Sequence, residues 1–230
     1  MEGRVSKSSL NTFLECERKY YYNNILKIQT PKNEIVQYGF DFHAIVEQFN
    51  KHITDEIYVD INNVADKFKQ PFLQYMIIID NYYDEDYKLF ASELTVKDET
   101  KNLYGIIDII LKKDDKYIII DLKTVVSFNE FKKEKYEREM VLYVYMLSKT
   151  QNIDISKIRT MLIRLQQNGE LYDENEIIIT EDLITKYLNE ADILNTKIKT
   201  SKGIIEEFNM IDKSHNNFKC VYCPFLNICK

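Results

Sequence analysis

Two neighbouring runs of branched aliphatic residues most constrain how this chain can fold. Residues 104–111 and 117–122 are rich in Ile, Leu and Tyr, and Asp114-Asp115 between them suits a turn. Residues 90–96 have the same character, so the three segments predict a β-meander in the middle of the chain. Each of the last two segments also holds one aspartate among isoleucines, which is an unusual place for a charge.

The segments on either side of this meander repeat apolar residues at helical spacing. The sequence predicts helices over 8–25, 38–53, 64–83 (where Pro71 can introduce a kink), 130–147 and 181–199. Two more strands are expected over 159–165 and 174–180, on either side of the turn pair Asn168-Gly169. The resulting order, ααα-βββ-α-ββ-α, indicates an α/β or α+β fold.

The composition is typical of an ordinary globular protein. Of the 230 residues, 45% are hydrophobic and 30% are charged, which excludes a disordered chain, a collagen and a disulfide-stapled miniprotein. Folding of a chain this long buries roughly 70% of its unfolded surface, enough for one core. We therefore expect one domain over 1–230, with a helical part (1–88), a sheet core (89–180) and a C-terminal helix with a cysteine motif (181–230).

Several classes of function can be excluded. The five glycines are too scattered for a dinucleotide-binding or P-loop motif. The longest apolar run that we find, 141–147, is far shorter than the roughly 20 residues that span a bilayer, and the N-terminus has no apolar signal segment. We therefore expect an intracellular, cytoplasmic protein without a membrane partner. The net charge of −6 argues against a general nucleic-acid coat but leaves room for a local basic channel.

Asp108 and Asp121 mark a candidate metal site. An isolated carboxylate costs several kcal/mol to bury, so an aspartate among isoleucines either ends a strand at solvent or binds a cation. Strand geometry puts Asp121 and Lys123 on one face, and a hairpin partner can bring Asp108 beside them. Carboxylates hold Mg²⁺ or Mn²⁺, and an ammonium group can orient water or stabilise developing charge. The set indicates phosphodiester hydrolysis; the alternative is that both aspartates only end edge strands.

A second motif lies in the predicted helix over 38–53. His43 and Glu47 are four residues apart, which stacks them on one face of the helix. The imidazole could complete the ligand set of the metal, with Glu47 fixing its tautomer. The alternative is a histidine that belongs to the core.

The four cysteines have the spacing of a metal site. Cys220, Cys223 and Cys229 form a C-x-x-C-x5-C motif at the C-terminus, and Cys16 lies far upstream. Disulfides are not expected inside the cell, so four thiolates match either one tetrahedral zinc or an iron–sulfur cluster. Structural free cysteines are the alternative, but three of the four would then not crowd into ten residues.

Together these residues resemble the RecB-like branch of the PD-(D/E)xK nuclease superfamily, in particular its iron–sulfur members, the AddB nuclease and the CRISPR-associated adaptation nucleases. The resemblance spans nearly the whole chain, and its motifs occur in the order that the family shows. They are the opening helix from Ser8-Ser9-Leu10 through Cys16 to Tyr21, Gly39-x-x-x-His43-x-x-x-Glu47, Ser92-Glu93, Gly105-Ile-Ile-Asp108, Asp121-Leu-Lys123-Thr124, Glu139-x-x-x-Tyr143, and Cys220-x-x-Cys223-Pro-Phe-x-x-Ile-Cys229.

The resemblance implies a fold and a cofactor. The fold is an α/β restriction-endonuclease-like core, with a central mixed β-sheet flanked by helices. The cofactor is a [4Fe-4S] cluster rather than zinc, which joins the N- and C-terminal segments through Cys16, Cys220, Cys223 and Cys229.

The resemblance also assigns roles at the nuclease site. His43, Asp108 and Asp121 are the expected metal ligands, the backbone carbonyl of Leu122 is a further ligand, and Lys123 is the expected catalytic lysine. Glu93 and Tyr143 are further catalytic candidates. The family's helix after D-x-K usually reads Q-x-x-x-Y, whereas this chain has Glu139 in place of the glutamine. A carboxylate there would repel DNA phosphate unless it contacts the metal or a lysine.

The sequence therefore predicts a Mg²⁺- or Mn²⁺-dependent DNA nuclease, acting as an exonuclease on single-stranded DNA or DNA ends. Arg18 and Lys19, beside the aromatic run 20–22, predict a DNA path with stacking faces, although these tyrosines could instead be core. The chain has no helicase motor, so it acts alone or borrows one from a helicase or CRISPR-adaptation partner.

Three pathways remain open at this stage: repair and recombination, phage replication, and CRISPR adaptation. The oligomeric state is open as well. The alternative class is a non-catalytic DNA-binding or assembly module stabilised by a cluster or zinc. The intact set of His, Asp, Asp and Lys disfavours that alternative.

Overall fold

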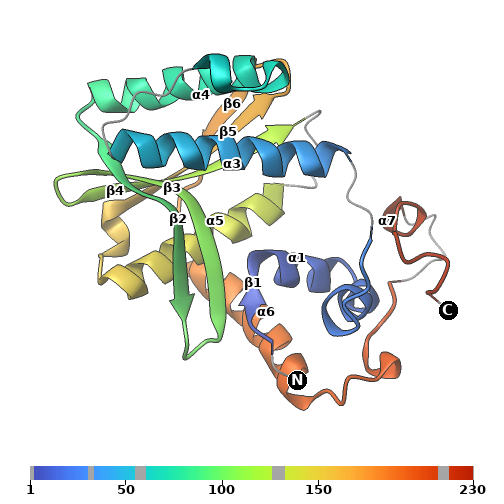
Figure 1. Cartoon of the computed structure of the whole chain (residues 1–230). Coiled ribbons are helices and arrows are strands. Elements are labelled where there is room, and N and C mark those ends of the chain that lie inside the picture. The colour runs from blue at the N-terminus through green and yellow to red at the C-terminus, as the bar shows by residue number, and fades with distance from the viewer. Residues whose placement is uncertain (1–2, 31–33, 55–60, 126–132, 212–217, 230) are drawn as a thin grey trace.

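A six-stranded mixed β-sheet forms the centre of the protein (Figure 1). The computed structural model describes residues 3–30, 34–54, 61–125, 133–211 and 218–229. The strands are β1 (Val5–Ser6), β2 (Lys88–Asp98), β3 (Leu103–Lys113), β4 (Lys116–Val125), β5 (Ile158–Gln166) and β6 (Leu171–Glu176).

Strand β3 organises this sheet. It pairs antiparallel with β2 and β4 and parallel with the short β1. Beyond β4 the sheet continues with β5, which is parallel to β4, and then with the antiparallel β6. The expected meander is present as β2, β3 and β4, and the expected mixed sheet is confirmed.

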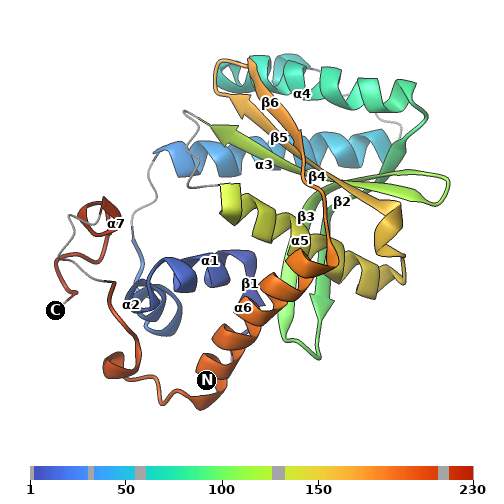
Figure 2. The same ribbon diagram turned by 180° about the vertical axis from the view of Figure 1, so that it is seen from behind.

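Helices cover both faces of the sheet (Figures 1 and 2). They are α1 (Lys7–Glu15), α2 (Glu17–Tyr20), α3 (Glu34–Thr54), α4 (Asp66–Asp84), α5 (Lys133–Gln151), α6 (Glu181–Thr200) and α7 (Phe218–Val221). Helices α3 and α4 lie on one face, whereas α5 packs on the other, with α1 and α6 against it. None of the helices in the described part of the chain is long and apolar enough to cross a membrane.

The alternation of side chains along β4 explains the two cores. Ile118 and Ile120 belong to the apolar cluster under α3 and α4, and Ile119 between them belongs to the cluster under α5 and α6. Successive strand residues point to opposite faces, so a run of isoleucines fills both cores at once. The aliphatic runs of the sequence are therefore strands buried on both faces.

Several boundaries differ from the sequence prediction. The expected helix over 8–25 is interrupted at Cys16, whose extended backbone (φ −168°, ψ 118°) ends α1 before α2 begins. The strand expected over 174–180 was misplaced, because β6 covers Leu171–Glu176 and Thr180 instead caps α6 with its side chain. The short β1 was not predicted. Residues 130–132 of the expected fourth helix lie outside the described residues.

The C-terminal segment packs against the start of the chain (Figure 2). Arg18 Nε donates a hydrogen bond to the carbonyl of Phe208 at 2.9 Å, and Tyr22 Oη donates to the carbonyl of Ile228 at 2.9 Å. Segments almost the length of the chain apart are thus held together by polar contacts as well as by packing.

Gly105 should be the glycine of β3 that tolerates no side chain. A Cβ at this position would lie 2.9 Å from both Cε of Met146 and Cε1 of the buried Tyr143 ring. Because the ring is enclosed, we expect Gly105→Ala to lower the free energy of unfolding by about 1–3 kcal/mol, as overpacking does. Urea denaturation measures this. Gly3→Ala is the matched control, since its Cβ would meet nothing closer than 3.9 Å; equal effects of the two substitutions would contradict the packing described.

Candidate active site

The site begins where β3 and β4 separate. The register of this hairpin runs from Lys113 opposite Lys116 to Ile109 opposite Ile120. Asp108 and Asp121 are the next residues on the two strands, so both carboxylates lie at the fork. The backbone N–H of Leu122 bridges the fork by donating to Asp108 Oδ2 at 3.0 Å. The sequence prediction that a hairpin brings the two aspartates together agrees with this geometry.

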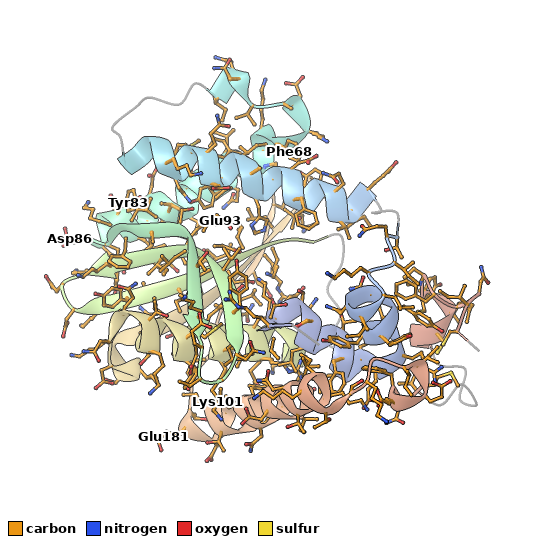
Figure 3. The ribbon with its side chains drawn as sticks, turned by 60° about the horizontal axis from the view of Figure 1, so that its bottom comes forward. Phe68, Tyr83, Asp86, Glu93, Lys101 and Glu181 are labelled. Atoms are coloured by element: carbon orange, nitrogen blue, oxygen red, sulfur yellow. The ribbon has the colours of Figure 1, made fainter. Side chains whose placement is uncertain are left out.

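A third carboxylate comes from β2, on the other side of β3. The pairs Ser92 with Ile109 and Leu94 with Ile107 place Glu93 directly across from Asp108. Glu93 has a positive φ of 52°, which is rare for this residue type and concentrates at functional sites. Figure 3 shows Glu93 beside α3, well away from Lys101 near α6.

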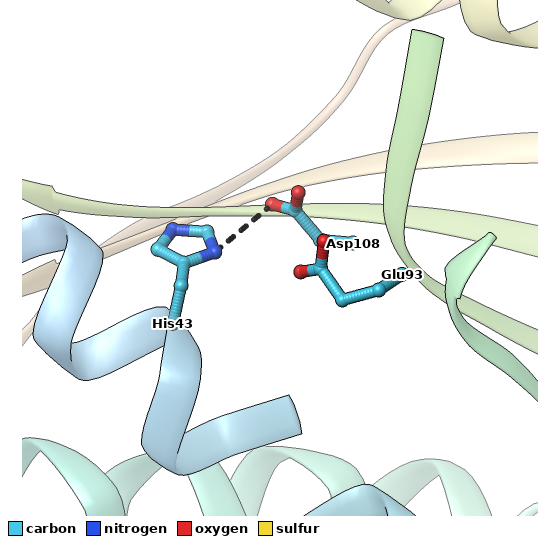
Figure 4. A group of neighbouring side chains, drawn as sticks. All are labelled: His43, Glu93 and Asp108. Atoms are coloured by element: carbon cyan, nitrogen blue, oxygen red, sulfur yellow. Dashed lines mark ion pairs between the residues drawn. The ribbon is translucent and has the colours of Figure 1, made fainter. Parts of the chain in front are cut away.

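Helix α3 supplies the imidazole. His43 Nδ1 lies 3.7 Å from Asp108 Oδ2, and one ligand atom from each of His43, Glu93 and Asp108 lies within 4.8 Å of the others (Figure 4). Gly39, one turn earlier on α3, has no side chain where Thr124 of β4 approaches, since a Cβ would lie 3.4 Å from Thr124 Oγ1. Helix α3 thus lies against β4 at Gly39 and presents His43 one turn later.

Carboxylates this close together repel one another. Burial is the largest cause that raises the pKa of Glu93, and the nearby Asp108 and Glu47 carboxylates add to it. Together these causes raise the pKa to about 7. A divalent cation between these groups would relieve the repulsion. The donor set of one imidazole and two carboxylates suits Mn²⁺ and related ions.

Asp121 lies outside this close group and is paired with two lysines. Its Oδ2 is 2.6 Å from Lys123 Nζ, and its Oδ1 is 3.6 Å from Lys7 Nζ. Burial alone would raise the pKa of the Asp121 carboxyl, but Lys123 and Lys7 outweigh burial and lower that pKa. Burial would lower the pKa of each lysine, yet Asp121 raises both, so the two ammonium groups stay charged.

Glu139 of α5 joins the same group of charges. Its Oε2 is 3.6 Å from Lys123 Nζ and 3.8 Å from Lys7 Nζ, and its Oε1 accepts a hydrogen bond from Asn11 Nδ2 at 2.9 Å. Glu139, which stands where the family usually has glutamine, therefore contacts lysines. Such a contact is one of the conditions, noted from the sequence, under which a carboxylate here would not repel DNA phosphate.

Lys7 is the residue that the sequence analysis missed. It is the first residue of α1, and its Nζ also lies 4.9 Å from the centre of the Tyr143 ring. More than a hundred residues separate Lys7 from Asp121, so spacing along the chain carries no signal of their contact. Its place just before the Ser8-Ser9 motif is the only hint in the sequence.

The residues present fit a bound metal ion. Both oxygens of Asp121, Glu139 Oε2 and the Tyr143 hydroxyl are buried and have no well-aligned hydrogen-bond partner among the described residues. The 2.6 Å contact of Asp121 with Lys123 is thus an ion pair of poor hydrogen-bond geometry. Buried oxygens that make ion pairs but no hydrogen bond are incompletely satisfied, and a cation is one way to satisfy them.

The residues expected to contact DNA have internal partners. Arg18 holds Phe208, as described above, and Lys19 Nζ is 2.8 Å from Glu15 Oε2. The neighbouring tyrosines are buried, which agrees with the alternative that they are core residues: Tyr20, Tyr21 and Tyr22.

The four cysteines line one pocket, together with Lys19 and Met210. None of them is in a disulfide within the described chain. Among the described residues, His43, Glu93 and Asp108 are the one group of three potential ligands whose atoms lie within 4.8 Å of one another. No three of the cysteine thiols lie that close together. A tetrahedral zinc with bonds of about 2.3 Å needs thiolates only about 4 Å apart. The pocket is therefore wider than a preformed single-zinc site.

The class of protein follows from the comparison with protein families, which agrees with the fold described above. The PD-(D/E)XK nuclease superfamily model matches residues 4–230, so the chain belongs to that superfamily. It is an enzyme that hydrolyses phosphodiester bonds. The chain is 23% identical over 215 residues to the CRISPR-associated exonuclease Cas4 of Francisella tularensis subsp. novicida (strain U112). The matched region covers 93% of this chain and 87% of that relative.

A solved structure shares the fold. It is a protein from Eubacterium rectale, proposed to be an exonuclease, with a TM-score of 0.61 and 12% sequence identity. The match covers 99% of this chain and 88% of the other.

Glu93 should make the metal-free protein pH-sensitive. Its folded pKa of about 7 exceeds its unfolded value, so the stabilisation is complete at low pH and is lost as pH rises through 7. We expect Glu93→Gln to match the wild type in EDTA only below the unfolded pKa of the carboxyl, near about pH 4, and to melt at a higher temperature than the wild type at pH 8.

Thermal melting in EDTA across this pH range checks the prediction. Glu206→Gln serves as the control because Glu206 is exposed. A Glu93→Gln variant whose melting temperature follows that of the wild type at every pH would show that Glu93 is not strained by its neighbours.

Proposed function

We propose that this nuclease is a Mg²⁺- or Mn²⁺-dependent DNA exonuclease that acts on single strands or DNA ends. The observation that carries the proposal is the convergence of His43, Glu93 and Asp108 beside the Lys123–Asp121 pair. In this proposal His43 and Asp108 hold the metal, Asp121 and the carbonyl of Leu122 complete its shell, and Glu93 is a further ligand. When bound, the ion polarises the phosphodiester and lowers the pKa of a bound water.

The chain's own residues supply the rest of the chemistry. The charged Lys123 ammonium orients water or stabilises the negative charge that develops on the phosphate. Tyr143 packs under Lys7 and shapes this side of the site. Arg18 and Lys19 remain the proposed contacts to the DNA strand.

End-labelled DNA tests the substrate and the mode of cleavage. Single- and double-stranded oligonucleotides are digested with Mg²⁺, Mn²⁺ or EDTA, and each is labelled at either end. Progressive shortening from one end that requires the metal supports the proposal. Cleavage in EDTA would overturn the metal dependence, and a ladder of internal cuts would overturn the exonuclease mode.

The partner and pathway follow from the relatives only as a proposal. The Francisella relative is CRISPR-associated by name. A role in CRISPR adaptation is therefore proposed here, with repair and recombination or phage replication as the other contexts. In this proposal the nuclease acts alone or with a helicase or CRISPR-adaptation partner.

We further propose that Cys16, Cys220, Cys223 and Cys229 hold a structural [4Fe-4S] cluster. One structural feature supports it: all four cysteines line one pocket. The pocket lies where the C-terminal segment meets α2. A cluster there would join the two ends of the chain.

Substitutions at the fork should abolish cleavage without unfolding the protein. We expect Asp108→Ala, Asp121→Ala or Lys123→Ala each to remove nearly all activity. The Asp108→Ala/Asp121→Ala double variant should be little worse than either single variant, since residues that act as one unit are not additive. Initial rates on labelled DNA measure the loss, and circular dichroism monitors the fold.

Asp66→Ala is the control, because its side chain is 94% exposed. Asp121→Asn replaces the alanine variant if the buried site does not tolerate alanine. Wild-type rates in either Asp121 variant would remove this residue from the reaction.

The cluster proposal predicts a brown protein after anaerobic purification, with iron and acid-labile sulfide near about four per chain. Cys16→Ala should lower both contents and the melting temperature. By analogy with a disulfide, closing a loop of about 200 residues lowers the entropy of the unfolded chain. This raises the free energy of unfolding by on the order of 5 kcal/mol.

Leu226→Ala, which alters the same pocket without removing a thiol, is the control. A colourless protein with one zinc would refute the cluster. Full iron content in Cys16→Ala would exclude Cys16 from the site.

A further inference from the structure

Four charged groups form a closed ring next to the metal ligands. Each of the two ammonium groups, Lys7 and Lys123, faces both carboxylates, Asp121 and Glu139. Lys7 Nζ lies 3.6 Å from Asp121 and 3.8 Å from Glu139. Lys123 Nζ lies 2.6 Å from Asp121 and 3.6 Å from Glu139. The ring is neutral as a whole.

The two lysines hold different oxygens of Asp121. Lys123 faces Oδ2, whereas Lys7 faces Oδ1 at a full ångström longer distance. Asp121 is 1% exposed, so neither oxygen can be satisfied by bulk water. A metal ion that takes an oxygen of Asp121 therefore competes with an ammonium group, and the longer contact, to Lys7, is the one that is more easily broken.

Glu139 is fixed in place as an alternative acceptor. Asn11 donates to Glu139 Oε1, and Arg138 Nη1 in turn donates to Asn11 Oδ1 at 2.7 Å. Arg138 is itself held by Glu190 Oε2, 2.6 Å from its Nε. This chain of hydrogen bonds leaves Glu139 Oε2 directed at the two lysines.

We propose that Lys7 is a positioning residue that competes with the metal for Asp121. When Asp121 becomes a metal ligand, the Lys7 ammonium group keeps Glu139 as its ion-pair partner. The inference rests on the proposed metal-dependent function and extends it to two residues outside the expected ligand set. Glutamine at position 139 would leave two ammonium groups to share one carboxylate. Glutamate keeps the ring neutral, so Lys7 and Glu139 form a matched pair.

The pair predicts opposite effects on metal binding. Lys7→Met removes the competitor and leaves an excess carboxylate, so Mn²⁺ should bind on the order of tenfold more tightly. Glu139→Gln leaves an excess ammonium group, so Mn²⁺ should bind on the order of tenfold more weakly. In the Lys7→Met/Glu139→Gln double variant the charges balance again, and affinity should return to within about threefold of the wild type.

Isothermal titration of the full-length protein with Mn²⁺ measures all four affinities without any turnover. Lys7→Arg, which keeps the charge, should bind like the wild type. Lys135→Met is the matched control, because Lys135 lies 4.0 Å from Glu139 but its half-exposed side chain is outside the ring; it should change the affinity less than twofold. If Lys7→Met does not fold, Lys7→Gln takes its place in the cycle.

The possible outcomes separate the two proposals. A wild-type protein that binds no Mn²⁺ would overturn the proposed metal-dependent function, and with it the exchange. Normal binding by the wild type with shifts of the same sign in Lys7→Met and Glu139→Gln, or with a double variant that does not recover, would overturn the inference about Lys7 alone. Opposite shifts that cancel in the double variant would establish it.

Discussion

The burial of charge at the fork between β3 and β4 is the constraint on which the rest of the structure depends. Removing one partner from a buried ion pair costs about 3–5 kcal/mol, so charges enter a protein interior together or not at all. The ring draws its members from three elements: Lys7 from α1, Asp121 and Lys123 from β4, and Glu139 from α5. Balance of the four charges therefore requires that these three elements pack together.

The fork also explains why two groups of charges remain distinct. The proposed metal ligands His43 and Asp108 lie on the side of α3, whereas Glu139 of α5 contacts Lys123, the partner of Asp121, from the other side. Asp108 and Asp121 lie at the same level of neighbouring strands, and the N–H of Leu122 connects the two strands by donating to Asp108. One group carries two carboxylates for a divalent ion, and the other is already neutral. The boundary between them is Asp121, the residue that can serve either.

The sequence predicted those features that depend on local spacing. Isoleucine runs with a turn between them predicted the hairpin, and Asp108 and Asp121 within these runs predicted its functional end. The helix with Gly39 and His43 was predicted from its period alone. The predicted limits of β6 were wrong, because the apolar residues before Thr180 look like a strand in the sequence. Thr180 instead caps helix α6.

Contacts across long stretches of chain could not be predicted from spacing. Lys7 reaches Asp121 only because β1 and α1 pack beside β3 and α5, and the Ser8-Ser9 motif next to Lys7 does not by itself indicate this contact. The internal partners of Arg18 depend in the same way on where Phe208 lies after folding. Glu139 was recognised as unusual, but the lysines that compensate for it became visible only in three dimensions.

Helix α1 connects the two sites that the sequence indicated separately. Lys7 is its first residue and belongs to the ring, whereas Cys16 follows its last residue and lines the cysteine pocket. A helix of nine residues is about 13 Å long, and Leu10 and Phe13 fix it in the core. Because the helix is rigid over this distance, the contacts that hold its C-terminal end also determine where Lys7 can reach. Stabilisation of the cysteine pocket by the C-terminal segment, and by the cluster proposed there, would therefore contribute to the position of the Lys7 ammonium group at the proposed nuclease site.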